Sequence, residues 1–359
     1  MKKILFVAYF PPPIHGLSKA VDTLYNSIIK KNYDIYKIDI SSNYKIIGTL
    51  LKLLYVRTDV VYFTISQSKW GNLRDLLLLA FIYLKGVKCI IHLHGGYYDK
   101  LMSDECNYIQ RKLNVCLMSK VNKGIVLGSS LIKVFRGYIP AEKIRVVPNC
   151  IDDEFILQAI DEKTEMLTMQ NKIHVVYLSN FIKEKGYREV LEVARIIKVR
   201  GREKDFVFHF AGKFFDMSEQ LFFEKYIERE GLSNIDYHGI VLAEEKNKLL
   251  KKGNVMILLT RYPSEGQPIS LLEGMGNGMA IVTTNHSGIP DIVTEHNGYI
   301  CDKNNLDLEK IADFLEKCFD DRYFLTKICK INHSWVKSNF TESEYIDKMN
   351  KVFMEVLDE

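Results

Sequence analysis

The stretch TRYPSEGQPISLLEGMGNG, residues 260–278, places one carboxylate in a Pro/Gly-rich loop and a second one eight residues later. The apolar run 255–260 before it predicts a strand, and the pattern after it predicts a helix over 269–277. Glu265 then lies in the loop and Glu273 on the second helical turn. The N–H groups at a helix start suit a phosphate, and carboxylates accept hydrogen bonds from hydroxyls. The segment therefore favours a ligand with hydroxyls on both sides of a diphosphate, such as a nucleotide sugar.

Short apolar runs alternate with helical patterns on both sides of this segment, which is typical of βαβ units around a parallel sheet. Strands are expected at 4–10, 59–65, 88–94, 124–129, 144–149, 174–179, 206–212, 235–239, 255–260 and 280–285. Helices are expected near 17–31, 72–85, 105–121, 186–201, 217–230, 243–252, 269–277 and 341–357. We therefore predict an α/β fold with two facing Rossmann-like domains, a cleft between them, and ligands at the carboxyl ends of the strands.

The polar stretch 152–172 separates the two series of strands and is interpreted as a linker. The predicted domains are an N-terminal acceptor-binding domain over 1–160 and a C-terminal nucleotide-sugar-binding domain over 170–338. The last helix, within 339–359, could pack on either domain, including back on the first.

Composition and charge restrict the possible environments. The chain has 359 residues, of which 47% are hydrophobic and 26% charged, enough for two globular cores. Its seven cysteines show no CxxC pair, which indicates reduced thiols in a cytoplasmic protein. The apolar start of the chain is short and ends in prolines, and the run at 76–84 is too short to span a membrane.

The net charge of +4 conceals an asymmetry. Residues 1–150 hold 22 Lys and Arg against 9 Asp and Glu, a net +13, whereas the remainder holds 27 against 36, a net −9. The first half is therefore expected to meet something anionic: a membrane, a pyrophosphate or a nucleic acid. Chance and solvated lysines are the alternative explanation.

Five further motifs share one order along the chain: FPPPIHG (10–16), HLHGG (92–96), VVPNCID (146–152), KEKG (183–186) and SGIPDIV (287–293). Together with the E-x7-E pattern of EGQPISLLEGMGNG, they resemble glycosyltransferase family 4 over essentially the whole chain. The resemblance implies the GT-B fold and a retaining, metal-independent hexosyltransferase. No DxD-type metal motif lies where one would be needed, so no metal and no cofactor is expected beyond the nucleotide-sugar substrate.

The resemblance also implies roles for individual residues. Glu273 would hold the ribose hydroxyls, Glu265 would contact the donor sugar, Lys185 would neutralise the leaving diphosphate, and His94 would contact the sugar beside the reaction centre. Backbone groups near Val241 would meet the base. Further donor contacts are expected at Gly16, Asn180, Gly266, Gln267, Ile269 and Ser270, and acceptor contacts at His15 and Gly16.

One position departs from the family. Asn180 stands where the family usually has an arginine, so it can donate a hydrogen bond but brings no charge. Lys183 or Arg261 could substitute for the missing cation. The loss also favours one alternative, a non-catalytic partner subunit of the same fold; a nucleotide-sugar epimerase is another alternative.

Simpler interpretations exist for several motifs. Glu265 and Glu273 could be a capping and a solvated glutamate, and Lys185 a solvated lysine. His92 and His94 point to one face of a strand, but no third metal ligand follows at a suitable spacing. His94 is interpreted as a site residue, and His92 as a core residue or as one that supports the site from behind. The GMGNG segment follows a helix and not a strand, which argues against a nicotinamide site.

The stretch 45–57 predicts an amphipathic helix with Lys45, Lys52 and Arg57, which could lie on anionic lipid or pack on its own sheet. With the basic first half, it favours a peripheral enzyme on the inner face of the cell membrane. The expected partners are a UDP-sugar in preference to a GDP-sugar, a lipid-linked saccharide acceptor in O-antigen or capsule assembly, and no nucleic acid, for which no motif is present.

Overall fold

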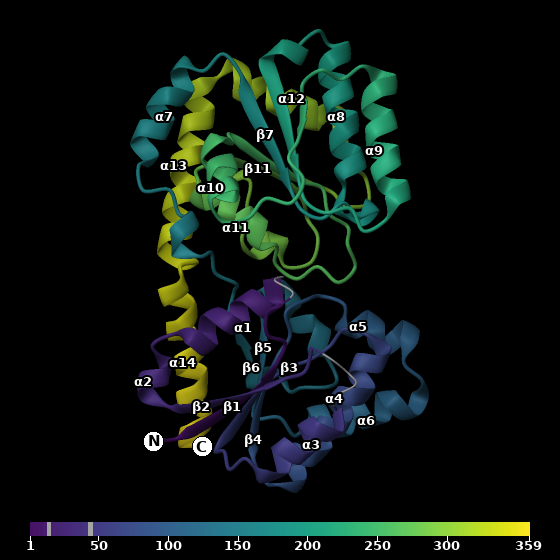
Figure 1. The fold of residues 1–359 in the computed structure, drawn as a ribbon, viewed down its shortest axis with the longest axis vertical. Coiled ribbons are helices and arrows are strands. Elements are labelled where there is room, and N and C mark those ends of the chain that lie inside the picture. The colour runs from purple at the N-terminus through teal and green to yellow at the C-terminus, as the bar shows by residue number, and fades with distance from the viewer. Residues whose placement is uncertain (13–15, 42–45) are drawn as a thin grey trace. The chain divides into compact units, whose positions relative to one another are not determined.

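The computed structural model describes residues 1–12, 16–41 and 46–359. Its internal contacts divide the chain into two compact units. Unit 1 comprises Met1–Cys150, Ser264–Gln267 and Glu342–Glu359, and unit 2 comprises Ile151–Pro263 and Pro268–Thr341. Each unit contains one six-stranded parallel sheet covered by helices, the layered α/β architecture that the sequence predicts (Figure 1).

The sheet of unit 1 has the order β2-β1-β3-β4-β5-β6, so the strand order reverses between β1 and β3. Alternate residues of β1 enter different cores: Leu5 and Val7 face one, and Ile4 and Phe6 the other. Both faces are therefore buried, as expected for parallel strands. The strands are β1 (Lys3–Ala8), β2 (Asp34–Asp39), β3 (Val60–Thr64), β4 (Lys88–His92), β5 (Lys123–Val126) and β6 (Ile144–Val146).

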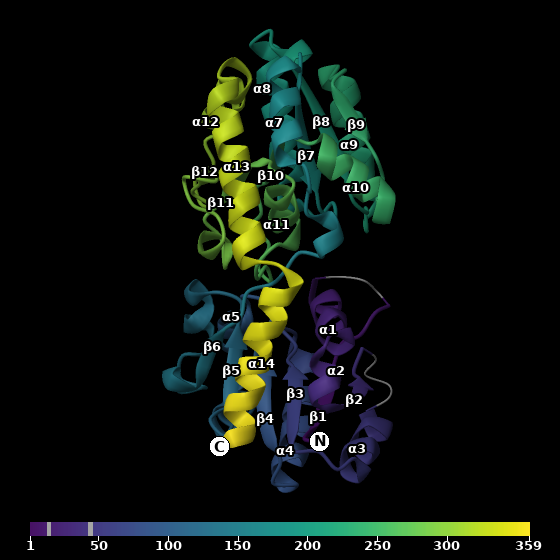
Figure 2. The same cartoon turned by 90° about the vertical axis from the view of Figure 1, so that its left-hand side faces the viewer.

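Two sets of helices cover this sheet. On one face lie α3 (Ile46–Tyr55), α4 (Lys69–Leu84), α5 (Tyr98–Lys100) and α6 (Tyr108–Met118). On the other lie α1 (Gly16–Asn26), the short α2 (Ile29–Asn32) and the C-terminal α14 (Glu342–Asp358). Figures 1 and 2 both show α14, in yellow, against the strands of unit 1, where Phe353 packs on Phe6 and Tyr62. The last helix thus belongs to unit 1.

The sheet of unit 2 has the order β12-β11-β10-β7-β8-β9, which reverses between β7 and β10. Counted from its own first strand, this is the 3-2-1-4-5-6 order of dinucleotide-binding folds. Ligands of such sheets bind where the order reverses. The strands are β7 (Ile173–Leu178), β8 (Phe206–Ala211), β9 (Ile235–Tyr237), β10 (Val255–Leu258), β11 (Ala280–Thr284) and β12 (Gly298–Cys301).

The helices of unit 2 enclose one continuous core. Helix α8 packs against α9 and α12, and α13 packs against α7 and α11. Their bounds are α7 (Ile160–Met169), α8 (Tyr187–Val199), α9 (Met217–Glu230), α10 (Ala243–Lys252), α11 (Ile269–Gly276), α12 (Leu308–Asp320) and α13 (Arg322–Asn339).

The structure differs from the sequence predictions in the segment 152–172, at two edge strands, and at α12 and α13, which were not among the expected helices. The expected linker 152–172 contains α7, whose Leu167 is buried in the core of unit 2. Strands β2 and β12 were not expected from the sequence, and both are sheet edges. Polar residues interrupt the apolar ones in β2, DIYKID, whereas β12, GYIC, has only four residues. The ten expected strands are all present. Across the described ranges, no helix is both long and apolar enough to cross a membrane.

Candidate donor and acceptor sites

The Lys185–Gly186 turn follows β7, at the reversal of the sheet of unit 2. Gly186 has φ of +84°, and a β-carbon there would lie 2.4 Å from the carbonyl oxygen of Leu259, which follows β10. Only glycine permits both the left-handed backbone and this close approach. The backbone N–H of Arg261 donates to the carbonyl of Glu184 over 2.6 Å. The loops after β7 and β10 are thus tied together.

The contact between the loops after β7 and β10 positions Lys185. Its Nζ atom lies 4.9 Å from the ring centroid of Tyr262, and the Tyr262 carbonyl is 2.8 Å from Nε2 of His286. The half-buried lysine therefore sits at the loop that leads to α11. This is the position at which a cation could meet a diphosphate bound at the sheet reversal.

The two proposed replacements for the missing arginine, Lys183 and Arg261, differ from Lys185 in their surroundings. The guanidinium of Arg261 is engaged by the carboxylate of Glu189, and Lys183 is exposed. The side chain of Asn180 accepts a hydrogen bond from the backbone N–H of Lys213 over 3.3 Å. Asn180 therefore fixes the loop after β8.

Helix α11 begins at Ile269, with Pro268 as the residue before it and not within the first turn. Ile269 and Ser270 occupy the first two helical positions, where backbone N–H groups point away from the helix. Glu273 is 6% exposed and accepts a hydrogen bond from Nζ of Lys246, on α10, over 2.5 Å. No local sequence pattern marks Lys246, because its partner lies 27 residues away on another helix.

The expected base-contacting segment follows β9. The carbonyl of Gly239 accepts from the N–H of Gly212 over 2.8 Å, which joins this segment to the end of β8. Val241 is half-buried against the core of unit 2.

By its contacts, the loop segment Ser264–Gln267 belongs to unit 1. Glu265 is buried, with 9% exposure. The Oε1 atom of Gln267 accepts from the N–H of Asn149 over 2.8 Å, Nδ2 of Asn149 donates to the Gln267 carbonyl over 2.9 Å, and Nε2 of Gln267 donates to the Leu127 carbonyl over 3.2 Å. The Gln267 side chain thus anchors the loop in unit 1. The VVPNCID motif contributes this anchor through Asn149, a role that sequence reasoning missed.

The same loop approaches His94. A β-carbon at Gly266 would lie 2.5 Å from the carbonyl oxygen of His94. The ring of His94 lies 3.8 Å, centroid to centroid, from that of His92. His92 is fully buried, and Nδ1 of His92 is 2.8 Å from the hydroxyl of Tyr62. Burial lowers the pKa of His92 well below its ordinary value, so it is a neutral core residue.

The segment FPPPIHG, residues 10–16, forms the glycine loop before α1 and is only partly described. Gly16 is exposed at the first position of α1, whereas His15 lies outside the described residues. Gln67, which the sequence did not single out, supports the loop after His94 by accepting from the N–H of Tyr97 over 2.7 Å.

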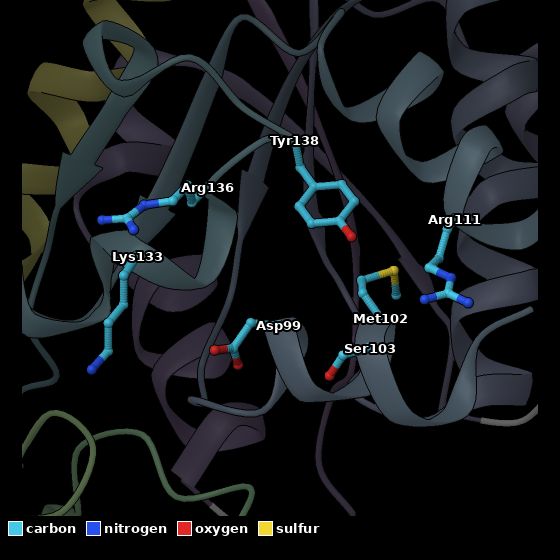
Figure 3. A pocket seen from close by; sticks show the side chains of 7 residues that line it. All are labelled: Asp99, Met102, Ser103, Arg111, Lys133, Arg136 and Tyr138. Carbon is cyan, nitrogen blue, oxygen red and sulfur yellow. The ribbon is translucent and has the colours of Figure 1, made fainter. Parts of the chain in front are cut away.

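Unit 1 also contains a pocket of about 450 Å³, formed by α5, the segment after it, α6 and residues 129–138 (Figure 3). Within the described parts of the chain, none of its three cations forms a salt bridge. Burial raises the pKa of Tyr138, which keeps its hydroxyl protonated and able to donate. Asp99, Met102, Ser103, Arg111, Lys133, Arg136 and Tyr138 line the pocket.

Comparison with known proteins adds independent support. The family model described as glycosyl transferases group 1 matches residues 160–337. A Klebsiella pneumoniae protein, named an uncharacterized 41.2 kDa protein in the cps region, is 26% identical over 44% of this chain; the match spans only 40% of that relative. The Escherichia coli UDP-Gal:alpha-D-GlcNAc-diphosphoundecaprenol alpha-1,3-galactosyltransferase is 22% identical over 76% of this chain and 71% of its own length.

Among solved structures, Anabaena HepE in complex with UDP and glucose superposes with a TM-score of 0.75 at 13% identity, covering 99% of this chain and all of that one. This likeness shows the fold, which is that of GT-B glycosyltransferases. The family model and the E. coli relative support a glycosyltransferase as the class of enzyme.

Proposed function

We propose that this chain is a retaining glycosyltransferase that moves a sugar from a UDP-sugar to a hydroxyl of a lipid-linked saccharide. The observation that carries the proposal is the arrangement at the sheet reversal of unit 2. There the Lys185–Gly186 turn is tied to the loop that enters α11, and the same helix carries the buried Glu273.

The proposed donor contacts follow from this arrangement. The first N–H groups of α11 and the ammonium of Lys185 meet the diphosphate, which supplies fixed electrostatic stabilisation as charge develops on the leaving group. Glu273, held by Lys246, accepts from the ribose hydroxyls. Glu265 and His94 contact the donor sugar. The transfer step itself uses no metal, and retention of configuration comes from the family resemblance.

The acceptor would bind to unit 1. The pocket in Figure 3 presents Arg111, Lys133 and Arg136 beside the hydroxyls of Ser103 and Tyr138. Among the described residues, no carboxylate lies within salt-bridge distance of these cations, although Asp99 also lines the pocket. Such cations suit a phosphate, and hydroxyls suit a saccharide. The name of the E. coli relative contains a diphosphoundecaprenol acceptor. We therefore assign the pocket to the diphosphate of a lipid-linked acceptor.

A membrane surface is the proposed location. Helix α3 buries Leu53 in the core of unit 1 but leaves Leu51, Leu54 and Tyr55 exposed by 50%, 49% and 83%. With Lys52 beside them, these side chains form an apolar and cationic face that suits anionic lipid.

The first experiment measures nucleotide release from a panel of UDP- and GDP-sugars, with and without a crude lipid extract, beside Glu265→Ala. Release from one UDP-sugar that rises with lipid and is lost in the variant is the expected result. Tight nucleotide binding without release under any condition would instead favour the non-catalytic partner subunit. Release without any acceptor requirement, together with sugar isomerisation, would favour an epimerase.

The acceptor site has its own test with adjacent cations on α6. Arg111→Gln should raise the KM for the lipid-linked acceptor at least about tenfold, because a charge-assisted hydrogen bond is lost, and should leave slow donor hydrolysis unchanged. Lys112→Gln removes a neighbouring charge that stacks 4.5 Å from the ring centroid of Tyr108 and does not line the pocket. Equal effects of the two substitutions would contradict the assignment.

A further inference from the structure

Three histidines form a line across the sheet of unit 2. His174 lies on β7, His209 on β8 and His238 directly after β9. Nδ1 of His174 is 2.9 Å from Nε2 of His209, and Nδ1 of His209 is 2.9 Å from Nε2 of His238. Asp236 pairs with His209 in the register of β8 and β9, and its Oδ2 atom is 3.3 Å from the same Nδ1. A buried imidazole thus meets a second imidazole and a carboxylate at one nitrogen.

These imidazoles are neutral at neutral pH. Burial is the largest cause that lowers the pKa of His209, to about 3, and that of His174, to about 4. The pKa of His238 is lowered as well, again mainly by burial. A neutral His209 forms no ion pair with Asp236, so the carboxylate is not neutralised by it. Neutral imidazole and ionised carboxylate are the forms that bind metal ions.

The three groups converge closely enough to share one ion. Ligand atoms of His209, Asp236 and His238 all lie within 4.8 Å of one another, and no other such trio occurs in the described ranges of the chain. In a tetrahedral zinc site, with bonds of about 2.0–2.1 Å, neighbouring ligand atoms are roughly 3.3 Å apart. The separations of 2.9 and 3.3 Å at His209 are near this value. His238 and Asp236 are exposed, so both can adjust while the buried His209 stays in place.

We propose that His209, Asp236 and His238 bind a divalent metal ion of the zinc type, with solvent completing the coordination. Two imidazoles and one carboxylate are ligands that suit zinc and the neighbouring transition metals. His174 is the positioning residue. When the metal takes Nδ1 of His209, the proton of that ring is on Nε2 and is donated to Nδ1 of His174, the outer hydrogen bond that ligating histidines usually make.

The ion would stabilise the outer edge of the sheet of unit 2. Strand β9 has three residues and forms the outer edge next to β8. Coordination by one ligand from β8 and two from β9 and its end adds a link across this short ladder. The segment that then begins at Gly239 is held at its origin. This role is structural and separate from the transfer of a sugar, so it stands or falls independently of the proposed function.

One nearby positive charge, on Lys252, would weaken binding of the metal ion. Lys252, at the end of α10, lowers the pKa of all three histidines through its charge. Its ammonium therefore also repels a bound cation. Lys252→Gln should tighten metal binding several-fold, which is the opposite sign from the loss of any ligand.

The test uses the full chain without a polyhistidine tag, after dialysis against a chelator. Zn²⁺ binding is measured by calorimetry, and Co²⁺ binding by its visible d–d bands. We expect one ion per chain and a higher midpoint of thermal unfolding in its presence, because the ion binds the folded form. His238→Gln and Asp236→Asn should each weaken binding by more than tenfold, and His174→Gln by about tenfold.

His296→Gln is the matched control, since His296 is an exposed histidine of unit 2 outside the cluster. It should leave the affinity unchanged. The proposal is overturned if no stoichiometric ion binds, or if His296→Gln lowers the affinity as much as His238→Gln. It is also overturned if His238→Gln has no effect while circular dichroism shows that the variant is folded. The buried His209 is left intact, because its substitution would disturb the core.

Discussion

Units 1 and 2 each contain a six-stranded parallel sheet, but they differ in strand order and in how their cations are used. The order reverses between β1 and β3 in unit 1, and between β7 and β10 in unit 2. In unit 2 the two strands at the reversal lead to Lys185 and to the loop that enters α11. In unit 1 they lead to the glycine loop before α1 and to Gln67, which supports the segment after His94.

The second difference is the share of arginines in each unit that pair with a carboxylate of the protein. In the described chain, six of the seven arginines of unit 2 lie within salt-bridge distance of a carboxylate, but only two of the five in unit 1 do. The six in unit 2 are Arg188, Arg195, Arg200, Arg202, Arg229 and Arg261. The two in unit 1 are Arg74 and Arg145.

This contrast indicates a division of tasks. A group whose partner is already in the protein is held in one geometry, and such preorganisation favours recognition of one defined ligand. Glu273 with Lys246 is an example. Cations such as Arg111 and Arg136, which line a pocket without such a partner, can pair with an anion from outside the protein. Under the proposed function, the same type of sheet would support a fixed donor site in unit 2 and an adaptable acceptor surface in unit 1.

The largest effect is expected from substitution of Lys185, the cation at the sheet reversal of unit 2. Lys185→Ala should lower the rate of transfer about 100- to 1,000-fold, because it removes fixed stabilisation of the leaving diphosphate and Asn180 supplies no charge in its place. Steady-state kinetics with the donor found in the panel measure this. Lys183→Ala is the control, since Lys183 is an exposed lysine in the same turn. Similar losses in both variants would remove the specific role of Lys185.

A smaller effect is expected at the carboxylate of α11. Glu273→Ala should weaken binding of UDP about 10- to 100-fold, because it removes charge-assisted hydrogen bonds and leaves Lys246 without its carboxylate. Calorimetry with UDP measures the change. Glu244→Ala removes an exposed carboxylate of α10 and should have no effect. Unchanged affinity for UDP in the Glu273 variant would end the ribose assignment.

Much of the fold was predictable from the sequence because both sheets are buried on two faces. Their inner strands are continuous apolar runs, such as ILFVA in β1, and such runs are recognisable without any contact information. The edge strand β2 escaped prediction because its exposed side permits polar residues, and β12 because its run GYIC has only four residues. The segment 152–172 was misread because α7 is polar on most of its surface and buries only a few residues, including Leu167.

For the candidate site, the sequence could indicate candidates only where one short segment contains the chemistry, as for Glu265, Glu273 and the Lys185–Gly186 turn, and their roles stay predictions. The site was not predictable where two distant segments meet. Lys246 pairs with Glu273 across 27 residues, and Asn149 anchors Gln267 across 118. No local pattern marks such residues as partners. The three histidines of unit 2 escaped notice for the same reason, since their alignment depends on the register of three strands.

The next effect concerns stability. Gly186→Ala forces a β-carbon onto the carbonyl oxygen of Leu259, whereas Gly201→Ala introduces one into open space; both glycines have positive φ. Gly201→Ala should therefore lower the free energy of unfolding by about 1 kcal/mol, the cost of the left-handed backbone alone. Gly186→Ala should lower it by about 2–3 kcal/mol or more. Urea unfolding measures both, and equal costs would show that the approach of the two loops is not a constraint.

The smallest effect is expected on the outer face of unit 1. Reversing Lys45, Lys52 and Arg57 together should reduce sedimentation with anionic vesicles at least about threefold, because each cation near such a surface contributes up to roughly 1 kcal/mol. Lys45 lies outside the described residues, whereas Lys52 belongs to α3. Reversal of three exposed lysines in unit 2, Lys172, Lys204 and Lys225, is the control for net charge and should change sedimentation little. If the two sets act alike, the protein responds to its total charge and α3 is no more than a helix of the core. If only the first set acts, the contrast between the units extends to the membrane, and the exposed side chains of Leu51 and Leu54 become the next positions to alter.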